Sequence, residues 1–336
     1  MRIEQDYSLI NHNTFQLPAK TRWFIEYESE EELSHLVKDD FFLRNRSFSI
    51  GEGSNILFIN DFDGIIIHCC IKKFTVTDET TGSVLLRVGA GVHWDDVVAV
   101  AVSSGWGGIE NLSYIPGEAG AAAIQNIGAY GVEIKDVIET VEAIHRLTGK
   151  KHVFTNAACQ YSYRHSYFKQ YDPNPYIITY ISLRLQKKPR FRLDYGILGS
   201  FLYGRDLSLQ SVREAVIEIR RSRLPEPSVL GNAGSFFMNP VIPEKQFDDL
   251  KGLFPAIPSY PAPEGMVKVP AGWLIEQCGF KGKREGNAGV YEKQALIIVN
   301  HGGATGEEIA SFARKISCKV YETFGINLVP EVKYVY

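Results

Sequence analysis

Three glycine-rich loops, each following an apolar segment, form the densest group of possible ligand-binding residues in the sequence. They lie at residues 51–55, 89–91 and 116–120. Glycine lets main-chain N–H groups approach a ligand closely, and successive N–H groups in such turns form an anion-binding concavity. One loop of this kind is more typical of an ordinary turn. Three loops so close in the sequence favour a site for a phosphate or a pyrophosphate.

Two common nucleotide-binding fingerprints do not fit these loops. After Gly51 and Gly53, the third glycine position of a Rossmann fingerprint holds Ile56, and residues 56–59 resemble a strand rather than a helix. The sequence also contains no G-x-x-x-x-G-K-[ST] pattern, which excludes a P-loop nucleotide hydrolase. A different cofactor fold is therefore needed.

A second group of residues surrounds Ser235, in the segment 231–240 that contains glycine, asparagine and phenylalanine. A serine held in such a turn can present its hydroxyl rigidly as a proton donor. A nucleophilic serine would need the pattern G-x-S-x-G, but position 237 is Phe. A purely structural serine turn remains the alternative at this point.

The third group lies around Arg164, within the aromatic segment 161–169. An arginine among aromatic residues often makes a cation–π contact, and its other common use is the bidentate capture of a carboxylate. Glu331 follows Pro330 in a strand-like segment near the end of the chain. Taken alone, it is typical of a surface glutamate on an edge strand.

Together these segments resemble a known cofactor fold. Residues 51–55, 115–117 and 125–131 resemble the FAD-binding (PCMH-type) domain of the vanillyl-alcohol-oxidase-like flavoproteins and, more closely, the UDP-N-acetylenolpyruvoylglucosamine reductase family. The resemblance extends from Asn13 to Val332, and it implies non-covalently bound FAD. The cofactor-binding residues that it implies are Gly51, Glu52, Gly53, Ser54, Asn55, Pro116, Gly117, Gln125, Asn126, Gly128, Ala129, Tyr130 and Gly131.

The resemblance also implies a reaction. NADPH would donate a hydride through FAD to the enolpyruvyl group of UDP-N-acetylglucosamine enolpyruvate, giving UDP-N-acetylmuramate for peptidoglycan synthesis. Ser235 matches the general acid of the family, Arg164 the residue that binds the enolpyruvyl carboxylate, and Glu331 its partner. The substrate-binding residues implied are Tyr163, Tyr195, Arg223, Asn239 and Gln294.

Two of these matches have special features. Tyr195 lies on a loop that resembles the lid of the longer variant of the family, and Arg223 stands where the family commonly has lysine.

The chemistry explains why three catalytic residues are needed. Hydride addition to an enol ether leaves negative charge that must be stabilised and then protonated. Arg164 would supply fixed positive charge, Glu331 a hydrogen bond and Ser235 the proton.

Two other functions stay open at this stage. A flavoprotein that oxidises a sugar or hydroxy acid with oxygen would explain the glycine loops, but not residues 231–240 or 330–332. A non-catalytic nucleotide-sugar-binding protein would not need Arg164, Ser235 and Glu331 together. Both alternatives therefore explain less of the sequence.

The composition is that of an ordinary globular protein. The chain has 336 residues, of which 45% are hydrophobic and 22% charged, and its net charge of −3 offers no basic surplus for nucleic acid. No apolar run approaches the length of a membrane span, and the start lacks an apolar secretory signal, so we expect a cytoplasmic protein. No obligate protein partner is inferred.

Metal sites and disulfides are not expected either. The five cysteines contain no Cys-x-x-Cys pair, which favours reduced structural cysteines. The eight histidines include no pair at helical i, i+4 spacing, and His68 and His93 look unremarkable. The sequence therefore predicts no metal site.

The elements that position these residues suggest an α+β fold. Capping boxes beginning at Ser29, Ser211 and Thr305 predict helices. Short β-branched segments at residues 48–50, 65–67, 84–88 and 176–185 predict strands, with one helix near residues 95–103. We expect a PCMH-type FAD-binding domain of two subdomains at residues 17–188, a linker and lid loop at 189–210, and a smaller substrate-binding domain at 211–336.

Overall fold

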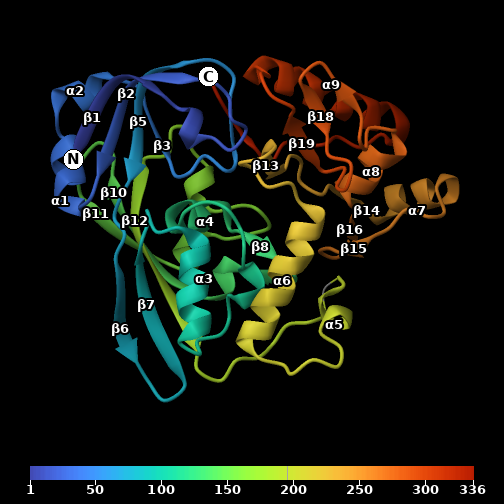
Figure 1. The fold of residues 1–336 in the computed structure, drawn as a ribbon, viewed down its shortest axis with the longest axis horizontal. Helices are drawn as coiled ribbons and strands as arrows, with labels where there is room; N and C mark the ends of the chain where they lie inside the picture. Colours follow the sequence, from blue (N-terminus) through green and yellow to red (C-terminus); the bar gives the residue numbers. More distant parts are fainter. Residues whose placement is uncertain (195) are drawn as a thin grey trace. The chain divides into compact units, whose positions relative to one another are not determined.

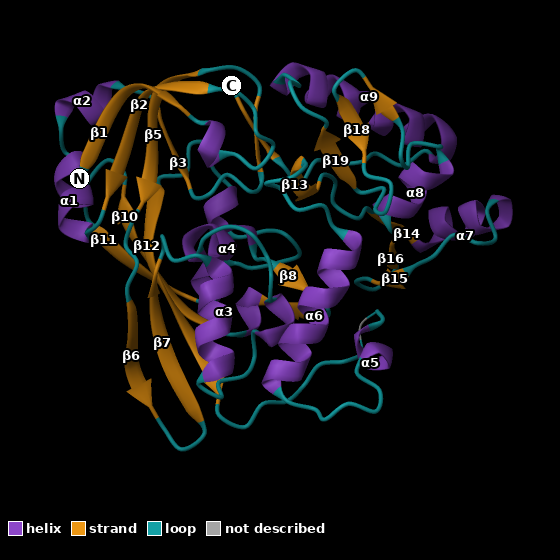
Figure 2. Ribbon diagram, in the orientation of Figure 1, coloured by secondary structure: helices purple, strands orange, loops and turns teal. Residues whose placement is uncertain are grey.

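The computed structural model describes residues 1–194 and 196–336, so the predicted lid residue Tyr195 lies outside the described residues. The chain divides into two compact units. We call them the N-terminal unit (Met1–Tyr7, Thr21–Glu52 and Phe62–Ser222) and the C-terminal unit (Ser8–Lys20, Gly53–Asp61 and Arg223–Tyr336). Each unit combines helices with strands, as Figure 1 and Figure 2 show, which confirms the predicted α+β class.

The first sheet of the N-terminal unit is partly parallel. Its strand order is β1 (Arg2–Ser8), β2 (Lys20–Tyr27), β5 (Phe62–Cys69) and β3 (Ser47–Ile50), with helices α1 (Glu30–Leu36) and α2 (Asp40–Arg44) between β2 and β3 along the chain. Both β2 and β3 pair in parallel with β5. A strand between parallel neighbours is covered on both faces, which explains why Ile65, Ile66 and Ile67 are all buried.

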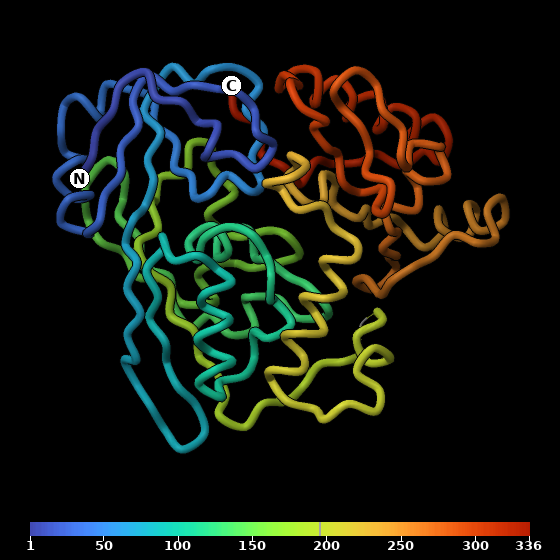
Figure 3. Tube along the Cα trace, viewed as in Figure 1, coloured from blue at the N-terminus to red at the C-terminus, as the bar shows by residue number. Residues whose placement is uncertain are grey.

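The second sheet of this unit is antiparallel. Its strand order is β11 (Lys151–Thr155), β10 (Ile138–His145), β12 (Tyr176–Gln186), β7 (Ser83–Gly89) and β6 (Phe74–Glu79). Figure 3 follows β6 and β7 as a long hairpin, and every residue of β6 is exposed. The predicted strands at residues 48–50, 65–67, 84–88 and 176–185 are confirmed as parts of β3, β5, β7 and β12.

Further helices follow in the N-terminal unit, and one of them covers part of the second sheet. The helices are α3 (Trp94–Ser103), α4 (Ala119–Gln125), α5 (Leu198–Phe201) and α6 (Leu209–Arg223), and α4 packs against β12 and β7. The strands β8 (Gly128–Ala129) and β9 (Val132–Glu133) form a small antiparallel pair. Short 3₁₀ helices occupy Ile10–His12, Glu110–Leu112, Ile134–Asp136, Ala157–Cys159 and Tyr167–Lys169.

The C-terminal unit is built around one main sheet, whose strand order is β13 (Gly231–Ser235), β19 (Ile297–Asn300), β18 (Ala288–Val290) and β17 (Arg284–Glu285). A smaller sheet contains β14 (Val241–Pro243), β16 (Met266–Lys268) and β15 (Tyr260–Pro261), and the helices are α7 (Glu244–Leu253), α8 (Ala271–Gln277) and α9 (Gly306–Phe324). The strand β20 (Lys333–Val335) pairs in parallel with β4 (Ile56–Phe58).

Two short segments from the first part of the chain complete this unit. Residues 53–61 contribute β4, and residues 8–20 contribute Phe15 and Leu17 to the core. The Asn300 side chain donates to the carbonyl oxygen of Phe15 at 2.8 Å, and the Asn232 N–H donates to Thr14 at 2.9 Å. The units therefore differ from the predicted domains, because α6 up to Ser222 also belongs to the N-terminal unit.

The predicted helix starts are confirmed at two of three places. The Ser29 and Thr305 side chains each accept a hydrogen bond from the N–H three residues later, and Gly325 ends α9 in the left-handed conformation. The predicted start at Ser211 is wrong. α6 begins at Leu209, and the hydroxyl of Ser208 accepts a hydrogen bond from the N–H of Ser211.

Among the helices of the described residues, none combines the length and apolar character needed to cross a bilayer.

Candidate active site

The three glycine loops meet within the N-terminal unit. The Gly117 N–H donates to Oε2 of Glu52 at 2.8 Å, which joins the first loop to the third. The Gly120 N–H donates to the carbonyl oxygen of Ala90 at 2.9 Å, which joins the second to the third. The tertiary structure thus gathers loops that the sequence separates by strands and α3.

Because glycine has no side chain, these loops can pack closely. A Cβ atom on Gly51 would lie 2.9 Å from Oε2 of Glu118, and one on Gly120 would lie 2.8 Å from Cβ of Ala90. Gly117 has a φ of +109°, which residues with side chains rarely adopt. Glycine at these positions is therefore required by close approach and by backbone conformation.

The remaining residues of the first loop, Gly53, Ser54 and Asn55, belong to the C-terminal unit. Gly53 has a φ of +70°, and a Cβ there would overlap the carbonyl oxygen of His12. The Asn55 side chain donates to the carbonyl oxygen of Glu331 at 3.2 Å. Asn55 therefore lies beside the segment of Glu331 within the C-terminal unit.

Arg164 and residues 125–131 form a second group in the N-terminal unit. The Arg164 guanidinium donates to the carbonyl oxygens of Gly128 at 2.9 Å and Asn126 at 3.4 Å. It also lies over the ring of Tyr163, 5.4 Å from the centroid, as the cation–π interpretation of this segment predicts. Asn126 in turn donates to Glu133 and to the carbonyl oxygen of Ser162. The arginine is therefore held against the predicted cofactor segment.

A third group lies in the C-terminal unit and contains Ser235 and Glu331. Ser235 is exposed and follows an irregularity in the pairing of β13 with β19, whereas the next residues, Phe236 and Phe237, are buried. The Glu331 N–H donates to the carbonyl oxygen of Phe236 at 2.8 Å. The structure therefore places these two predicted residues on hydrogen-bonded segments, about 100 positions apart in the sequence.

Comparisons with known proteins identify the family. A model of an FAD binding domain matches residues 22–154, and a model of the C-terminal domain of UDP-N-acetylenolpyruvoylglucosamine reductase matches residues 226–335. The reductase of that name from Porphyromonas gingivalis is 52% identical, with 100% of both chains covered. This chain belongs to the UDP-N-acetylenolpyruvoylglucosamine reductase family.

Further comparisons agree with this family. The reductase of the same name from Bacteroides fragilis is 45% identical, with 99% of this chain and 100% of its own length covered. The crystal structure of UDP-N-acetylenolpyruvylglucosamine reductase from Thermus caldophilus matches with a TM-score of 0.71 at 23% identity and covers 100% of both chains. That structural match supports the fold.

The residues present fit FAD, the cofactor of the family. The Gly117 N–H donates to Oε2 of Glu52, so this loop presents a main-chain donor to an oxygen acceptor. Such a loop suits the oxygens of a diphosphate. The remaining predicted cofactor residues Ala129, Tyr130 and Gly131 lie on the turn that begins in β8, and the Asn111 side chain donates to the carbonyl oxygen of Tyr130 at 2.9 Å.

Within the third loop, Glu118 contacts the side chain of His68. Nε2 of His68 lies 2.8 Å from Oε1 of Glu118, and Nδ1 lies 3.1 Å from Oε1 of Glu26. Burial opposes the charge on His68, but its hydrogen bonds with Cys70, Glu118 and Glu26 outweigh burial and raise its pKa to about 10. His68 therefore bridges the carboxyl groups of Glu118 and Glu26.

The predicted substrate-binding residues of the family lie in several places. The Asn239 side chain accepts the N–H of Ala271 at 2.9 Å, and Oε1 of Gln294 would lie 3.2 Å from a Cβ on Gly272. Both therefore lie at the beginning of α8. Arg223 is exposed at the end of α6. The prediction for Tyr195 concerns a residue outside the described residues.

Two cations that the sequence analysis did not single out, Lys169 and Arg220, lie near the predicted residues Gln125 and Arg164. Nζ of Lys169 donates to Oε1 of Gln125 at 2.8 Å and to the carbonyl oxygen of Arg164 at 3.0 Å. Nε of Arg220 donates to the carbonyl oxygen of Tyr114 at 3.0 Å. Burial lowers the pKa of Arg220, and the charge of Arg164 acts in the same direction, so the two arginines share one region. The helical i, i+7 spacing of Arg213 and Arg220 places both on one face of α6 and is a signal that could have marked this face.

Proposed function

We propose that this chain reduces the enolpyruvyl group of UDP-N-acetylglucosamine enolpyruvate with NADPH, giving UDP-N-acetylmuramate for peptidoglycan synthesis. The full-length identity of 52% to the reductase of Porphyromonas gingivalis carries this proposal. A flavoprotein oxidase would need neither the C-terminal domain of the family nor the hydrogen-bonded segments of Ser235 and Glu331. The reductase function accounts for both.

When bound, FAD would accept a hydride from the nicotinamide and pass it to the substrate. No protein side chain can do this. The residues that would hold it are those of the glycine loops and of the segment 125–131. Gly51, Glu52, Gly53, Ser54 and Asn55 would form one side of its diphosphate site. Pro116 and Gly117 would form another, because the Gly117 N–H is directed at an anionic oxygen.

Arg164 would bind the carboxylate of the enolpyruvyl group and stabilise the negative charge that develops on it. Its guanidinium is fixed by the carbonyl oxygens of Gly128 and Asn126, so little reorganisation is needed during the reaction. Glu331, when protonated, would donate a hydrogen bond to the same carboxylate. A planar guanidinium suits this task better than an ammonium group.

Ser235 would then deliver the proton to the carbon next to the carboxylate. Its hydroxyl is exposed, and its backbone is supported by the buried rings of Phe236 and Phe237. A serine hydroxyl is weakly acidic, so it acts here as a relay for a proton held by neighbouring groups. Tyr163, Tyr195, Arg223, Asn239 and Gln294 would contact the remainder of the nucleotide sugar.

The proposal includes the cellular setting. The substrates would be the nucleotide sugar and NADPH alone, with no nucleic acid, membrane or obligate protein partner. The expected compartment is the cytoplasm, since NADPH and nucleotide-activated sugars are held there. We keep the predicted roles as a proposal, with cofactor binding at residues 17–188, the linker and lid at 189–210 and substrate binding at 211–336, although residues 53–61 belong to the C-terminal unit and residues 211–222 to the N-terminal unit.

An anaerobic experiment with the purified yellow protein tests the proposal. NADPH is added first, and loss of the flavin absorption shows that the first half-reaction occurs. UDP-N-acetylglucosamine enolpyruvate is then added, and we expect the oxidised flavin spectrum to return. If NADPH bleaches the flavin and the substrate does not restore it, the substrate assignment is wrong. A colourless protein that cannot be reconstituted with FAD would support the non-catalytic alternative.

A further inference from the structure

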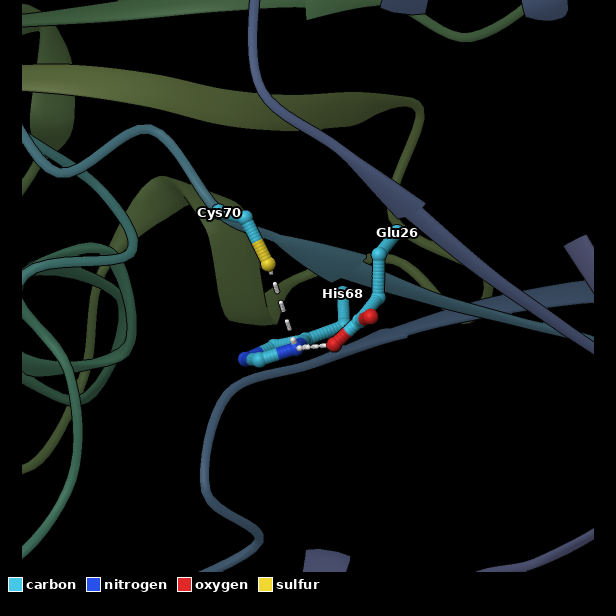
Figure 4. A group of neighbouring side chains, drawn as sticks. All are labelled: Glu26, His68 and Cys70. Atoms are coloured by element: carbon cyan, nitrogen blue, oxygen red, sulfur yellow. Dashed lines mark hydrogen bonds and ion pairs between the residues drawn. The ribbon is translucent and has the colours of Figure 1, made fainter. Parts of the chain in front are cut away.

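Three side chains that the proposed reaction does not use lie together on the parallel sheet of the N-terminal unit. Glu26 lies on β2, His68 lies on β5, and Cys70 follows directly after β5. Figure 4 shows the Cys70 thiol and the Glu26 carboxylate turned toward the same nitrogen of His68. Oε1 of Glu26, Nδ1 of His68 and Sγ of Cys70 all lie within 4.8 Å of one another.

The sheet geometry explains why these residues converge. His68 and Cys70 are two positions apart, and alternate residues of an extended chain point to the same face. Glu26 is the residue directly opposite His68 in the parallel pairing of β2 with β5. Neighbours across a pair of strands lie close enough for their side chains to interact. The cluster is therefore built by strand spacing rather than by the helical spacing that the sequence analysis considered.

The distances are close to those of a metal centre. Zinc bound at about 2.0–2.3 Å by tetrahedrally arranged ligands would separate its donors by about 3.3–3.6 Å. Nδ1 of His68 lies 3.1 Å from Oε1 of Glu26 and 3.8 Å from Sγ of Cys70. These two separations would each change by about 0.2 Å to reach that range. The sulfur and the carboxylate oxygen lie within 4.8 Å of each other, and rotation of the partly exposed Cys70 side chain would bring them closer.

The surroundings also suit a cation. Nε2 of His68 contacts Oε1 of Glu118 at 2.8 Å, and this carboxylate–histidine arrangement typically fixes the tautomer of a metal-binding imidazole. Oε2 of Glu26 is held by Arg2 at 2.9 Å, which leaves Oε1 directed at His68.

We propose that Glu26, His68 and Cys70 form a binding site for a thiophilic divalent cation, with Zn²⁺ the best match. Thiolate, imidazole and carboxylate are all ligands that zinc accepts, whereas Mg²⁺ and Ca²⁺ prefer oxygen alone. Three protein ligands leave a fourth position for water. The site is separate from the proposed reaction, since none of its ligands belongs to the predicted cofactor or substrate residues.

Calorimetric titration with Zn²⁺ tests the site in the full FAD-loaded chain, in a reducing buffer without chelators. We expect one Zn²⁺ per chain. Cys70→Ala and Glu26→Gln should each weaken binding by at least about 10-fold, the loss typical of supporting residues around a metal. The matched control is Cys318→Ala, because Cys318 is an exposed cysteine on α9 in the C-terminal unit, and it should bind as the unmodified chain does.

Zinc-edge X-ray absorption gives a second measurement that needs no variant. The unmodified chain loaded with one equivalent of Zn²⁺ should show one sulfur neighbour at about 2.3 Å and lighter neighbours at about 2.0–2.2 Å. Absence of a sulfur neighbour would overturn the proposal. So would unchanged affinity in Cys70→Ala, or a loss of binding in Cys318→Ala alone. In each of these cases the three residues form only a hydrogen-bonded ion pair.

Discussion

Arg164 and Asn126 share a left-handed backbone, with φ values of 54° and 47°. This conformation costs a residue with a side chain on the order of 1 kcal/mol or more, so surrounding contacts must compensate. The compensation is visible, because Asn126 makes hydrogen bonds to Glu133, Ser162 and Lys135 and Arg164 is held by Asn126 and Gly128. Strain of this kind is concentrated at functional sites. It supports the proposed role of Arg164 in binding a carboxylate.

Replacement of Ser235 separates the two half-reactions. In Ser235→Ala, we expect NADPH to reduce the flavin at nearly the unmodified rate, since no proton transfer by serine is needed there. Reoxidation by the enolpyruvyl substrate should slow by about 10²–10⁴-fold, the usual contribution of a general acid. Anaerobic stopped-flow absorption measures both rates. Ser103→Ala, an exposed serine at the end of α3, is the control. Equal loss in both half-reactions would mean that Ser235 is structural.

A single methyl group added at Gly53 should destabilise the protein. In Gly53→Ala, the left-handed backbone and the overlap with the carbonyl oxygen of His12 should lower the free energy of unfolding by at least about 1–3 kcal/mol. FAD content should fall with it. Gly82→Ala is the control, because a Cβ there meets nothing within 4 Å, and its effect should stay within about 0.5 kcal/mol. Thermal unfolding measures the stability of the two variants, and flavin absorption measures their FAD content. If Gly53→Ala behaved like Gly82→Ala, the close contact of Gly53 with His12 would be wrong.

At the scale of elements, an ion pair ties α6 to α3 and to the third glycine loop. Asp95 receives two hydrogen bonds from Arg213, both at 2.7 Å, and one from the N–H of Tyr114 at 2.5 Å. Burial of Asp95 opposes its ionisation, but the hydrogen bonds from Arg213 and from Tyr114 outweigh burial and hold its pKa below the usual value. Tyr114 leads directly into Pro116 and Gly117. The helices therefore set the position of the proposed cofactor loop.

Loss of this ion pair should depend on pH. Asp95→Asn should lower the free energy of unfolding by about 2–3 kcal/mol at pH 7, because Arg213 loses a charged acceptor. Since the folded-state pKa of Asp95 is lowered, its contribution is complete above about pH 4, the unfolded value. It is lost as the pH falls through the lower folded-state pKa. Urea unfolding of both proteins at several pH values should show a difference that shrinks only in acid.

The neighbouring Asp96 provides the control for this experiment. It lies on the first turn of α3 and is exposed. Asp96→Asn should cost no more than about 1 kcal/mol, from the helix dipole alone. If the two variants were equally destabilised at every pH, the contact between Asp95 and Arg213 would not be the source of the effect.

At the scale of the whole molecule, the C-terminal unit depends on residues from the first part of the chain. Phe15, Leu17, Leu57 and Ile59 belong to its core, and β20 has its partner in β4. These contacts join residues separated by more than 200 positions, so this unit cannot complete its core from a continuous stretch of sequence. Its stability is therefore a property of the whole chain.

A fragment of residues 223–336 tests this dependence. We expect the isolated fragment to lack a cooperative thermal transition and a dispersed amide NMR spectrum, because four buried apolar side chains and one strand are missing. The full chain in the same buffer is the control. A sharp transition and well-dispersed signals from the fragment would show that residues 8–20 and 53–61 are dispensable.

The sequence by itself determined the features that depend on local chemistry. Glycine patterns marked the three loops, the caps at Ser29 and Thr305 marked two helix starts, and the motifs around Arg164, Ser235 and Glu331 led to the family. These signals are local, because a turn, a cap or a motif is written in a few adjacent residues. At Ser211 the local signal was ambiguous, since Ser208 offers the same hydroxyl one turn earlier.

Only the tertiary structure decided which distant residues meet. Glu26 contacts His68 because β2 and β5 pair in a particular register, and nothing in either segment specifies that register. In the same way, β4 joins β20, and Arg220 lies near Arg164, through packing between segments far apart in the chain. The physical reason is that burial of apolar surface selects these pairings from the chain as a whole, whereas spacing within one segment reports only on that segment.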